Sequence, residues 1–520
     1  MNLNRKLWWA QHKTDVYKYG TIFTLTLIVT ISIIYFTYSK FTSTNEMTMY
    51  ETTVQPFIKN DYFIASYING EWSDSIPGKS DGYVVDKVVC DNGATGTWDN
   101  EEWGINIRNA TKKIKCSVYF EIPLDINVEL AQGMIPVKFD DSGNVVVADT
   151  STKWYNYKTH EWANAVLVNC ADSAIKSKYF NDDMSLKSSV VGSTISMDEI
   201  MQMYVYIPRY KYQLFNAEDG TSDPQAINIT FESKTTAKST GTKNGEWLTH
   251  PAFTFGDKEL AGIWVGKFET SNAYALPKIV PNVSSSIYMI MSEQFNTSRL
   301  MTTTLASTYG TSTNDDSHMM KNMEWGAVAY LSSSIYGRYT NASTCIESGC
   351  EVWINNNSSY TTGCAGSSVS ASSASTCNAW NTATGVNAST TGNIYGIYDM
   401  SGGATEYVMG NYNDTIIGSA EFSSMPEAKY YDKYTGTDSN SDFTKYHLGD
   451  ATKETVKTKS SGTNSWYGDY SYSVYSSYPW VDRGGNYNNG SNAGVFSFAL
   501  EDGDSYSDHS FRVAFGTLKE

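Results

Sequence analysis

Residues Arg483–Phe515 read RGGNYNNGSNAGVFSFALEDGDSYSDHSFRVAF, and this stretch decides how the last part of the chain folds. It opens with an Arg-Gly-Gly triplet, whose glycines allow close backbone approach where a strand enters the core. It closes on a strand-like run in which Phe511 and Val513 alternate with other residues. We expect this closing strand to pair with the opening strand of the domain, and we expect the motifs at both ends to maintain the fold.

Three earlier segments accompany this stretch, and each has an apolar framework. They read GIWVGKFETSNAY at Gly262–Tyr274, NMEWGAVAYLSS at Asn322–Ser333 and NIYGIYDMSGGATEYVMGNY at Asn393–Tyr412. In the second segment, Ala327, Val328 and Leu331 recur at helical spacing. This spacing predicts a helix over Met323–Ser333.

In this order, the four segments resemble the formylglycine-generating-enzyme/sulfatase-modifying-factor family, a variant of the C-type lectin fold. The family shows a K-x-E-V-T-N strand, a W-x-x-A-x-A-Y helix, a G-L-Y-D-M-x-G-N-x-W-E-W segment and an R-G-G-S-W…G-F-R-V-A close. The resemblance covers about residues 203–520. It implies an α+β fold class with a C-type-lectin-like domain at the C-terminus. Because enzymes and pure binders share this scaffold, the fold alone does not decide function.

The resemblance implies copper-dependent oxidation only where a pair of cysteines follows Arg-Gly-Gly. Here Asn486–Leu500 contains no cysteine, histidine or methionine, whereas Cu(I) requires soft ligands. Relatives that use non-haem iron need a set of histidines, but the six histidines of this chain are scattered: His12, His160, His250, His318, His447 and His509. We therefore expect no enzyme, no catalytic residue and no metal ligand. The alternative is a metal-dependent oxidoreductase of the formylglycine-generating type with an unusual metal site.

Calcium is the cofactor that the resemblance implies for Ser401–Glu406, which reads SGGATE. In the family, the matching segment supplies backbone carbonyls and a glutamate to a structural calcium. Glu406 matches that glutamate, but Gly403 stands at the usual asparagine and Thr405 at the usual tryptophan. Both departures count against the metal. We expect no cofactor and keep a structural calcium in an oxygen cage as the alternative.

The segment between the Arg-Gly-Gly and closing motifs is rich in the residue types of antibody paratopes. Tyrosine supplies contact area with few torsions to freeze, and Ser, Asn and Gly supply adaptable hydrogen bonds. A binding loop held by a rigid scaffold is a common arrangement. The alternative is a polar surface loop that binds nothing in particular. We predict ligand contacts at Trp480, Asn486, Tyr487, Asn488, Asn489, Ser491, Asn492, Asp502, Asp504, Tyr506, Asp508 and His509.

The same segment resembles the variable region of proteins diversified by retroelements. There, adenines in Asn codons are randomised, and the products favour Asn, Tyr, Ser, Asp, His and Gly. Asp502–Ser510 contains only residue types reachable in this way. The sequence thus predicts a recognition protein whose partner is an unidentified surface protein, glycan or phage ligand. A structural surface component that assembles through this face is a further alternative.

Composition agrees with an extracellular recognition protein. The 520 residues include 55 acidic and 38 basic side chains, which gives a formal net charge of −17. No basic stripe is available to neutralise phosphates, so we expect no nucleic-acid partner. The 38 tyrosines beside 39 glycines favour folds rich in strands and loops.

The N-terminal region predicts a membrane anchor. Tyr19–Ser39 contains no charged residue and is long enough to span a bilayer. The positive-inside rule places residues 1–18 in the cytoplasm and the rest outside, because four basic residues precede the span: Arg5, Lys6, Lys13 and Lys18. We expect a single-pass protein of the cell membrane with its C-terminal domain extracellular. A cleaved signal peptide is the alternative, although no small-x-small cleavage site follows.

Outside the membrane, cysteines can form lasting disulfides. Cys90 and Cys116 lie on strand-like runs and suit a cross-strand bridge, whereas Cys170 is left over. The other four lie within Cys345–Cys377 with their pairing open. A zinc site is the alternative for this cluster, but it lacks a CxxC pair and a nearby histidine.

Turn signals between these landmarks divide the extracellular part into modules. The dipeptides Asn69-Gly70 and Asn92-Gly93 interrupt period-2 alternation in a region that we interpret as a β-sandwich module. We expect the sandwich at residues 51–125, a β-meander or linker module at 130–200, and the C-type-lectin-like domain at 203–520.

Overall fold

The computed structural model describes residue 13 and residues 62–518, apart from 74, 79–82, 111, 122–123, 219, 341–344 and 346–348. The cytoplasmic tail and membrane anchor predicted at residues 1–39 lie, except for residue 13, outside these described residues. Among the described residues, no helix combines the length and the apolar character that a membrane span needs. The regular secondary structure of the described residues is mostly β-strand, with a few short helices.

Residues 62–121 form a small β module whose main sheet has the strand order β2-β1-β6-β3, with β4 and β5 paired in a hairpin. Asn69 and Gly70 have positive φ angles in the turn after β1, as an Asn-Gly hairpin requires. Trp98 of the hairpin packs on Phe120 of the sheet, with ring centroids 5.2 Å apart. The strands are β1 (Tyr62–Ile68), β2 (Glu71–Trp72), β3 (Val84–Cys90), β4 (Thr95–Asp99), β5 (Gly104–Arg108) and β6 (Lys115–Glu121).

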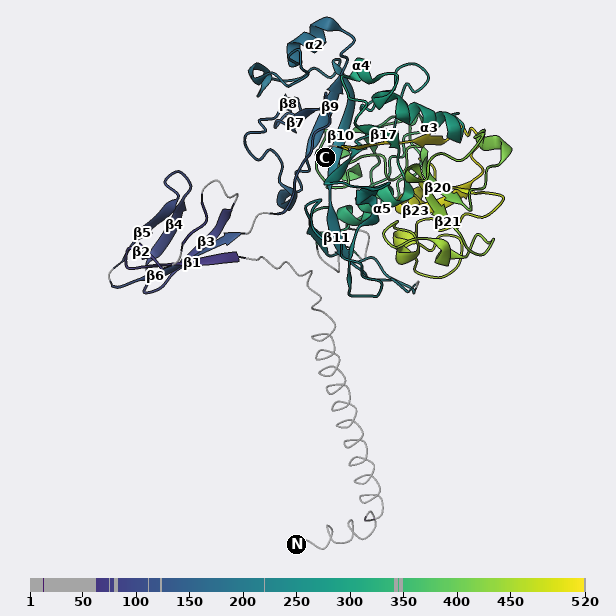
Figure 1. Cartoon of the computed structure of the whole chain (residues 1–520). Coiled ribbons are helices and arrows are strands. Elements are labelled where there is room, and N and C mark those ends of the chain that lie inside the picture. The colour runs from purple at the N-terminus through teal and green to yellow at the C-terminus, as the bar shows by residue number, and fades with distance from the viewer. Residues whose placement is uncertain are drawn as a thin grey trace. The chain divides into compact units, whose positions relative to one another are not determined.

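A seven-stranded sheet of the large domain has the order β17-β25-β16-β10-β9-β7-β8. Figure 1 labels its strands β7, β8, β9, β10 and β17. Its central strands β10 and β16 are buried along their whole length, which explains their nearly continuous apolar sequences. The closing strand β25 pairs with β16, where Trp264 lies opposite Phe515. The strands are β7 (Ile135–Phe139), β8 (Val145–Val147), β9 (Asn164–Val168), β10 (Ile200–Pro208), β16 (Gly262–Gly266), β17 (Asp316–Met319) and β25 (Val513–Gly516).

The predicted division between a module at 130–200 and a domain from 203 does not separate two sheets. Strand β9 pairs with β10 along its length, with Val166 opposite Met203. Turn signals in the sequence mark where strands end, but they do not say which sheet each strand joins. The meander is therefore one edge of the large domain's own sheet.

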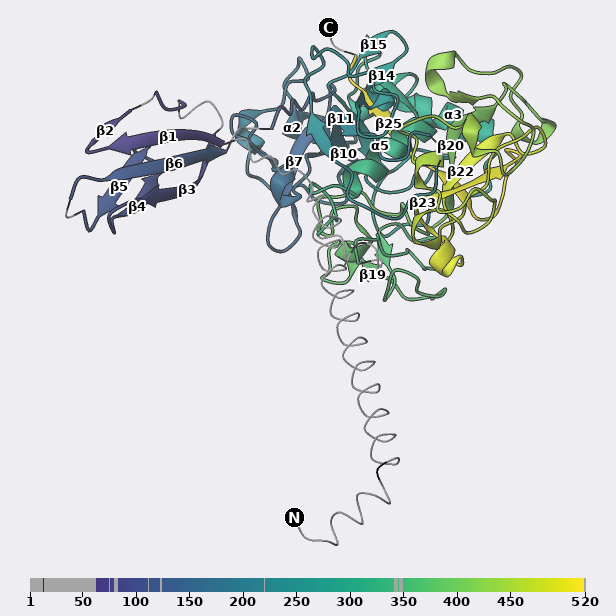
Figure 2. The same ribbon diagram turned by 90° about the horizontal axis from the view of Figure 1, so that it is seen from below.

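A second sheet carries the segment that the sequence assigns to recognition (Figure 2). Its order is β21-β20-β22-β23, and β24 also pairs with β20. The strands are β20 (Thr405–Tyr412), β21 (Asp432–Tyr434), β22 (Trp480–Gly484), β23 (Gly494–Glu501) and β24 (His509–Phe511).

Short strands and helices fill the rest of the domain. The helix predicted at Met323–Ser333 is α5 (Asn322–Ser332), and all of its residues are buried. The other α-helices with described bounds are α2 (Ser173–Tyr179), α3 (Met291–Arg299) and α4 (Ala306–Tyr309), and several 3-10 turns lie between the strands. The remaining strands are β11 (Tyr210–Gln213), β12 (Ile229–Phe231), β13 (Trp247–Thr249), β14 (Thr254–Phe255), β15 (Lys258–Glu259), β18 (Cys364–Ala365) and β19 (Asn378–Ala379).

Three disulfides confirm the cysteine prediction and resolve the pairing that it left open. The cross-strand bridge joins Cys90 to Cys116, which lie opposite each other on β3 and β6. The later cluster forms two local bridges, Cys345–Cys350 and Cys364–Cys377. Cys170 is free and buried. Since all four sulfurs of the cluster pair with one another, they do not form the zinc site considered as an alternative.

Candidate functional site

The Arg-Gly-Gly triplet anchors the recognition segment to the core. The buried guanidinium of Arg483 donates to Asn322 Oδ1 at 3.0 Å and to the carbonyls of Asp450 and Ala451 at 3.2 Å each. Gly484 and Gly485 follow with φ angles of 81° and 65°, which favour glycine. The chain thus leaves the core through a fixed turn immediately before Asn486.

Most of the predicted contact residues after this turn are accessible. Three of them, Asn488, Ser491 and Asp504, are exposed. The half-buried ones are Asn486, Tyr487, Asn489, Asn492, Asp502, Tyr506 and Asp508.

Two predicted contact residues lie inside the domain instead. Trp480 is 0% exposed and packs on Phe422 with ring centroids 5.4 Å apart, because its strand β22 lies between β20 and β23. His509 is 6% exposed. The prediction that Trp480 contacts a ligand at the surface is therefore corrected, while His509 belongs to a buried cluster described below.

Tyrosines from distant parts of the sequence lie beside the recognition segment in the structure. Tyr274 and Tyr288 are 66% and 60% exposed, the largest exposed fractions among the large apolar side chains that the structure describes. The Tyr274 hydroxyl donates to the Tyr288 carbonyl at 2.6 Å, and the Tyr288 amide donates to the Tyr506 carbonyl at 3.0 Å. Tyr360 meets Tyr487 edge to face at 5.0 Å. We call Tyr274, Tyr288, Tyr360, Tyr487 and Tyr506 the tyrosine surface.

Tyr360 interacts electrostatically both with Tyr487 of the recognition segment and with Tyr288. Burial raises the pKa of the Tyr360 hydroxyl, and Tyr487, Asp508 and Tyr288 raise it further. Asn486 Nδ2 donates to Asp508 Oδ2 at 2.8 Å, which ties the start of the recognition segment to its end.

Backbone strain occurs at two members of the tyrosine surface. Tyr288 and Tyr360 have φ angles of 60° and 53°, in the left-handed region that is costly for bulky side chains. The Tyr360 carbonyl accepts from the Ser285 amide at 2.9 Å, and the Tyr288 amide is held by Tyr506 as described. Strain of this kind clusters at binding and active sites, where the surrounding fold maintains it. It was not visible in the sequence, because neither residue lies in a glycine-like or Asn-Gly turn pattern.

A compact acidic cluster with one histidine lies on the same sheet. Asp482 on β22, Glu501 at the end of β23 and His509 on β24 each offer a ligand atom, and these atoms lie within 4.8 Å of one another. His509 Nδ1 lies 2.9 Å from Asp508 Oδ1, and its Nε2 lies 3.6 Å from Asp482 Oδ2. The sequence predicts His509 as a ligand contact and gives no signal for Asp482 or Glu501. It could not group them, because the grouping depends on strand register.

Electrostatics in this cluster follow from burial and like charge. Burial raises the pKa of Glu501 to about 7, and the neighbouring Asp482 carboxylate adds to the effect. Burial alone would lower the pKa of His509, but the Asp482 and Asp508 carboxylates outweigh it and raise that pKa to about 9.

The segment Ser401–Glu406 does not fit the calcium site that the family resemblance implies. Both carboxylate oxygens of Glu406 accept from Arg512, with Nε at 3.0 Å from Oε2 and Nη2 bonded to Oε1. Gly403 has no side-chain oxygen to take the place of the family's asparagine. The segment therefore lacks a free carboxylate ligand for a cation.

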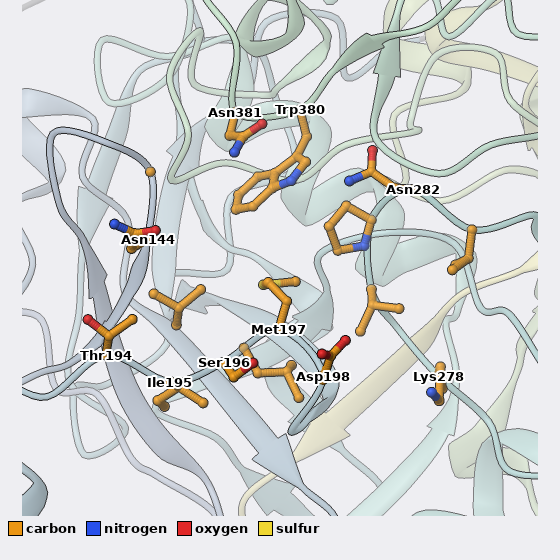
Figure 3. A pocket seen from close by; sticks show the side chains of 16 residues that line it. Asn144, Thr194, Ile195, Ser196, Met197, Asp198, Lys278, Asn282, Trp380 and Asn381 are labelled. Atoms are coloured by element: carbon orange, nitrogen blue, oxygen red, sulfur yellow. The ribbon is translucent and has the colours of Figure 1, made fainter.

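A separate cavity of about 570 Å³ opens elsewhere on the domain, between the turn before β8, residues 194–200 and the loop 278–283 (Figure 3). Figure 3 shows the indole of Trp380 and the amides of Asn144, Asn282 and Asn381 around it. Its size suits a small ligand. None of the predicted contact residues lines it.

Comparisons with known proteins do not assign the chain to a family. No family model matches it, and no curated protein matches it. Among solved structures it is similar to Treponema denticola variable protein 1, at 11% sequence identity over 60% of this chain and 95% of that chain, with a TM-score of 0.25. A TM-score this low does not establish a common fold.

Proposed function

We propose that this chain is a membrane-anchored extracellular recognition protein that binds its ligand non-covalently through the tyrosine surface of a C-type-lectin-like domain. The observation that carries the proposal is the exposure of Tyr274 and Tyr288 beside Tyr506, on a face that also presents the recognition segment. Exposed tyrosines on a rigid frame bind with little loss of side-chain entropy. Arg483 and the buried strand β25 supply that frame.

The charges on this face narrow the class of ligand. Asp502 accepts from the Tyr506 hydroxyl at 3.1 Å, Asp508 acts electrostatically on Tyr360, and the chain carries a net charge of −17. Such a surface repels anions and attracts neutral or cationic partners. A surface protein, a neutral glycan or a phage component meets this requirement, whereas a nucleic acid does not.

Replacing Tyr288 with serine is expected to weaken ligand binding by about 30-fold or more, which is the effect of losing a binding hot spot of about 2 kcal/mol. The purified full chain would first be screened on a glycan array and on intact bacterial cells and phage particles. Affinity for the strongest binder would then be measured for wild type, Tyr288→Ser and Tyr274→Ser.

Tyr478→Ser is the matched control, because Tyr478 is 38% exposed and packs only on Tyr475 among the ring contacts of the described residues. It should bind as wild type does. Ligand binding that is unchanged in both Tyr288→Ser and Tyr274→Ser would refute the tyrosine surface as the binding site.

The residue types of Asp502–Ser510 support a diversified variable region within this proposal. Exposed Asn488, Ser491 and Asp504 are held between a buried Arg483 and a buried Phe511, as variation on a fixed frame requires. The nucleotide sequence beside the gene tests this. A near-copy of codons 480–515 that differs mainly at adenines, next to a reverse transcriptase, would support diversification, and its absence would leave ordinary ligand binding.

The two other functional classes have direct tests. An oxidoreductase of the formylglycine-generating type would consume oxygen with thiol-containing peptides, and we expect none. A self-assembling surface component would elute as a large species on size-exclusion chromatography, and we expect no concentration-dependent growth in size.

A further inference from the structure

We infer that Asp482, Glu501 and His509 form a binding site for one divalent transition-metal ion of the zinc type. This inference does not depend on which ligand the tyrosine surface binds. In the part of the chain that the structure describes, this is the one group of three or more such side chains whose ligand atoms converge. One imidazole nitrogen and two carboxylate oxygens are donors that Zn²⁺ accepts, and three protein ligands leave a fourth position for water.

The strand register places the three donors on one face of the sheet. Asp482 lies opposite Tyr407 of β20 and Ala499 of β23. Glu501 pairs with Trp480, two residues from Asp482, so Asp482 and Glu501 are diagonal neighbours on that face. His509 enters from β24, beside Thr405 of β20. Strands β22 and β24 both pair with β20, and β23 pairs with β22, so one sheet fixes the three donors. This reduces the cost of organising them around an ion.

His509 has the arrangement of a metal ligand rather than that of a satisfied core histidine. Its Nδ1 lies 2.9 Å from Asp508 Oδ1. In metal sites, a carboxylate on the ring nitrogen that does not bind the metal orients the imidazole in this way. Its Nε2 is buried and has no hydrogen-bond partner. That nitrogen lies 3.6 Å from Asp482 Oδ2, which is within ion-pair distance but too far for a hydrogen bond.

The surroundings allow an ion to enter and exclude bulk water from the other sides. Glu501 is half-buried, so one side of the cluster reaches solvent. The rings of Tyr407 and Tyr506 lie against His509, with centroids 4.8 Å and 5.0 Å from the imidazole. A bound cation would also offset the repulsion between the Asp482 and Glu501 carboxylates.

The test uses Zn²⁺ alone and the full chain in detergent, after dialysis against a chelator. Isothermal titration and competition with a chromophoric chelator should show saturable binding of one Zn²⁺ per chain. Glu501→Gln should weaken the affinity at least about tenfold, since even an outer-shell partner of a metal ligand costs this much. His509→Gln should do the same, and Asp508→Asn should weaken the affinity through the orientation of His509.

Glu427→Gln is the matched control, because Glu427 is an exposed carboxylate that belongs neither to the cluster nor to the recognition segment. It should bind Zn²⁺ as wild type does. Circular dichroism of Glu501→Gln, whose side chain is only half-buried, separates loss of the site from loss of the fold. No saturable binding by wild type, equal affinity in Glu501→Gln and His509→Gln, or tighter binding of Ca²⁺ that survives His509→Gln would each overturn the inference. None of these results alters ligand binding in the Tyr288 experiment, so the two proposals fail separately.

Discussion

Replacing Arg512 with methionine is expected to lower the free energy of unfolding by about 3–5 kcal/mol, the cost of breaking a buried ion pair from one side. The Arg512 and Glu406 side chains are both 0% exposed. The guanidinium donates to both oxygens of Glu406, to the Gly266 carbonyl at 2.8 Å and to the Tyr398 carbonyl at 3.0 Å. Methionine would leave the Glu406 carboxylate buried without its counter-charge and would orphan both carbonyls.

This arginine matters because it joins the two large sheets. Gly266 belongs to β16 in the seven-stranded sheet, and Glu406 belongs to β20 in the second sheet. The loss of stability should therefore appear as a lower urea midpoint of the whole large domain rather than as local fraying.

Two further variants separate the buried charge from the lost contacts. Combining Arg512→Met with Glu406→Leu removes both charges and should recover part of the loss, because a buried ion pair can often be replaced by apolar side chains. Lys433→Met is the exposed control: Lys433 pairs with Asp414, and the two side chains are 45% and 38% exposed. It should cost about 1 kcal/mol or less. An Arg512→Met loss as small as that of Lys433→Met would show that the pair does not hold the sheets together.

The framework was predictable because its signals are local. The spacing of Ala327, Val328 and Leu331 placed a helix that the structure puts at Asn322–Ser332, one residue earlier than expected. The Asn69-Gly70 turn and the Cys90–Cys116 bridge followed from turn chemistry and strand-like runs. Each depends on residues that are close in sequence or on one pair of neighbouring strands.

The candidate site was only partly predictable, because it is assembled from segments far apart in the sequence. Composition identified Tyr487 and Tyr506, but nothing near Tyr288 or Tyr360 pointed to a binding surface. Trp480 looked like a contact residue by its type, whereas its burial depends on β22 being an inner strand of the second sheet. Likewise, Glu501 and Asp482 become neighbours only through the pairing of β22 with β23.

The second large effect concerns a buried histidine in the seven-stranded sheet. His318 lies between two carboxylates, with Nδ1 at 2.9 Å from Asp316 Oδ1 and Nε2 at 3.0 Å from Glu324 Oε1. Its ring stacks on Phe255 at 4.8 Å. Burial opposes its charged form, but Glu324 and Asp316 outweigh burial and raise the pKa of His318 from 6.5 to about 9.

Other charged and titratable groups in the same neighbourhood act on the carboxylates. Lys321 Nζ lies 3.9 Å from Glu324, and Arg299 lies 4.0 Å from Asp316. The Tyr430 hydroxyl donates to Asp316 Oδ2 at 2.8 Å. Despite their burial, the pKa values of Glu324 and Asp316 are lowered, chiefly by His318. The carboxylates therefore stay charged while His318 titrates.

We expect the His318 ion pairs to stabilise the fold fully below pH 6.5 and to lose about 3 kcal/mol as the pH rises through about 9. The sign follows from a folded pKa above the unfolded one, because the folded state then holds the proton more tightly. Asp316 and Glu324 act in the opposite direction at low pH, because their pKa values are lowered in the folded protein. The stability that they contribute is lost as they become protonated in the acid range. Urea unfolding of wild type and His318→Gln, measured at several pH values, should show a stability difference that is largest on the acid side of pH 6.5 and shrinks toward pH 9. His447→Gln is the control, because His447 is exposed, and its stability should follow the wild-type curve. A difference between wild type and His318→Gln that is constant with pH would show that His318 is not charged in the folded protein.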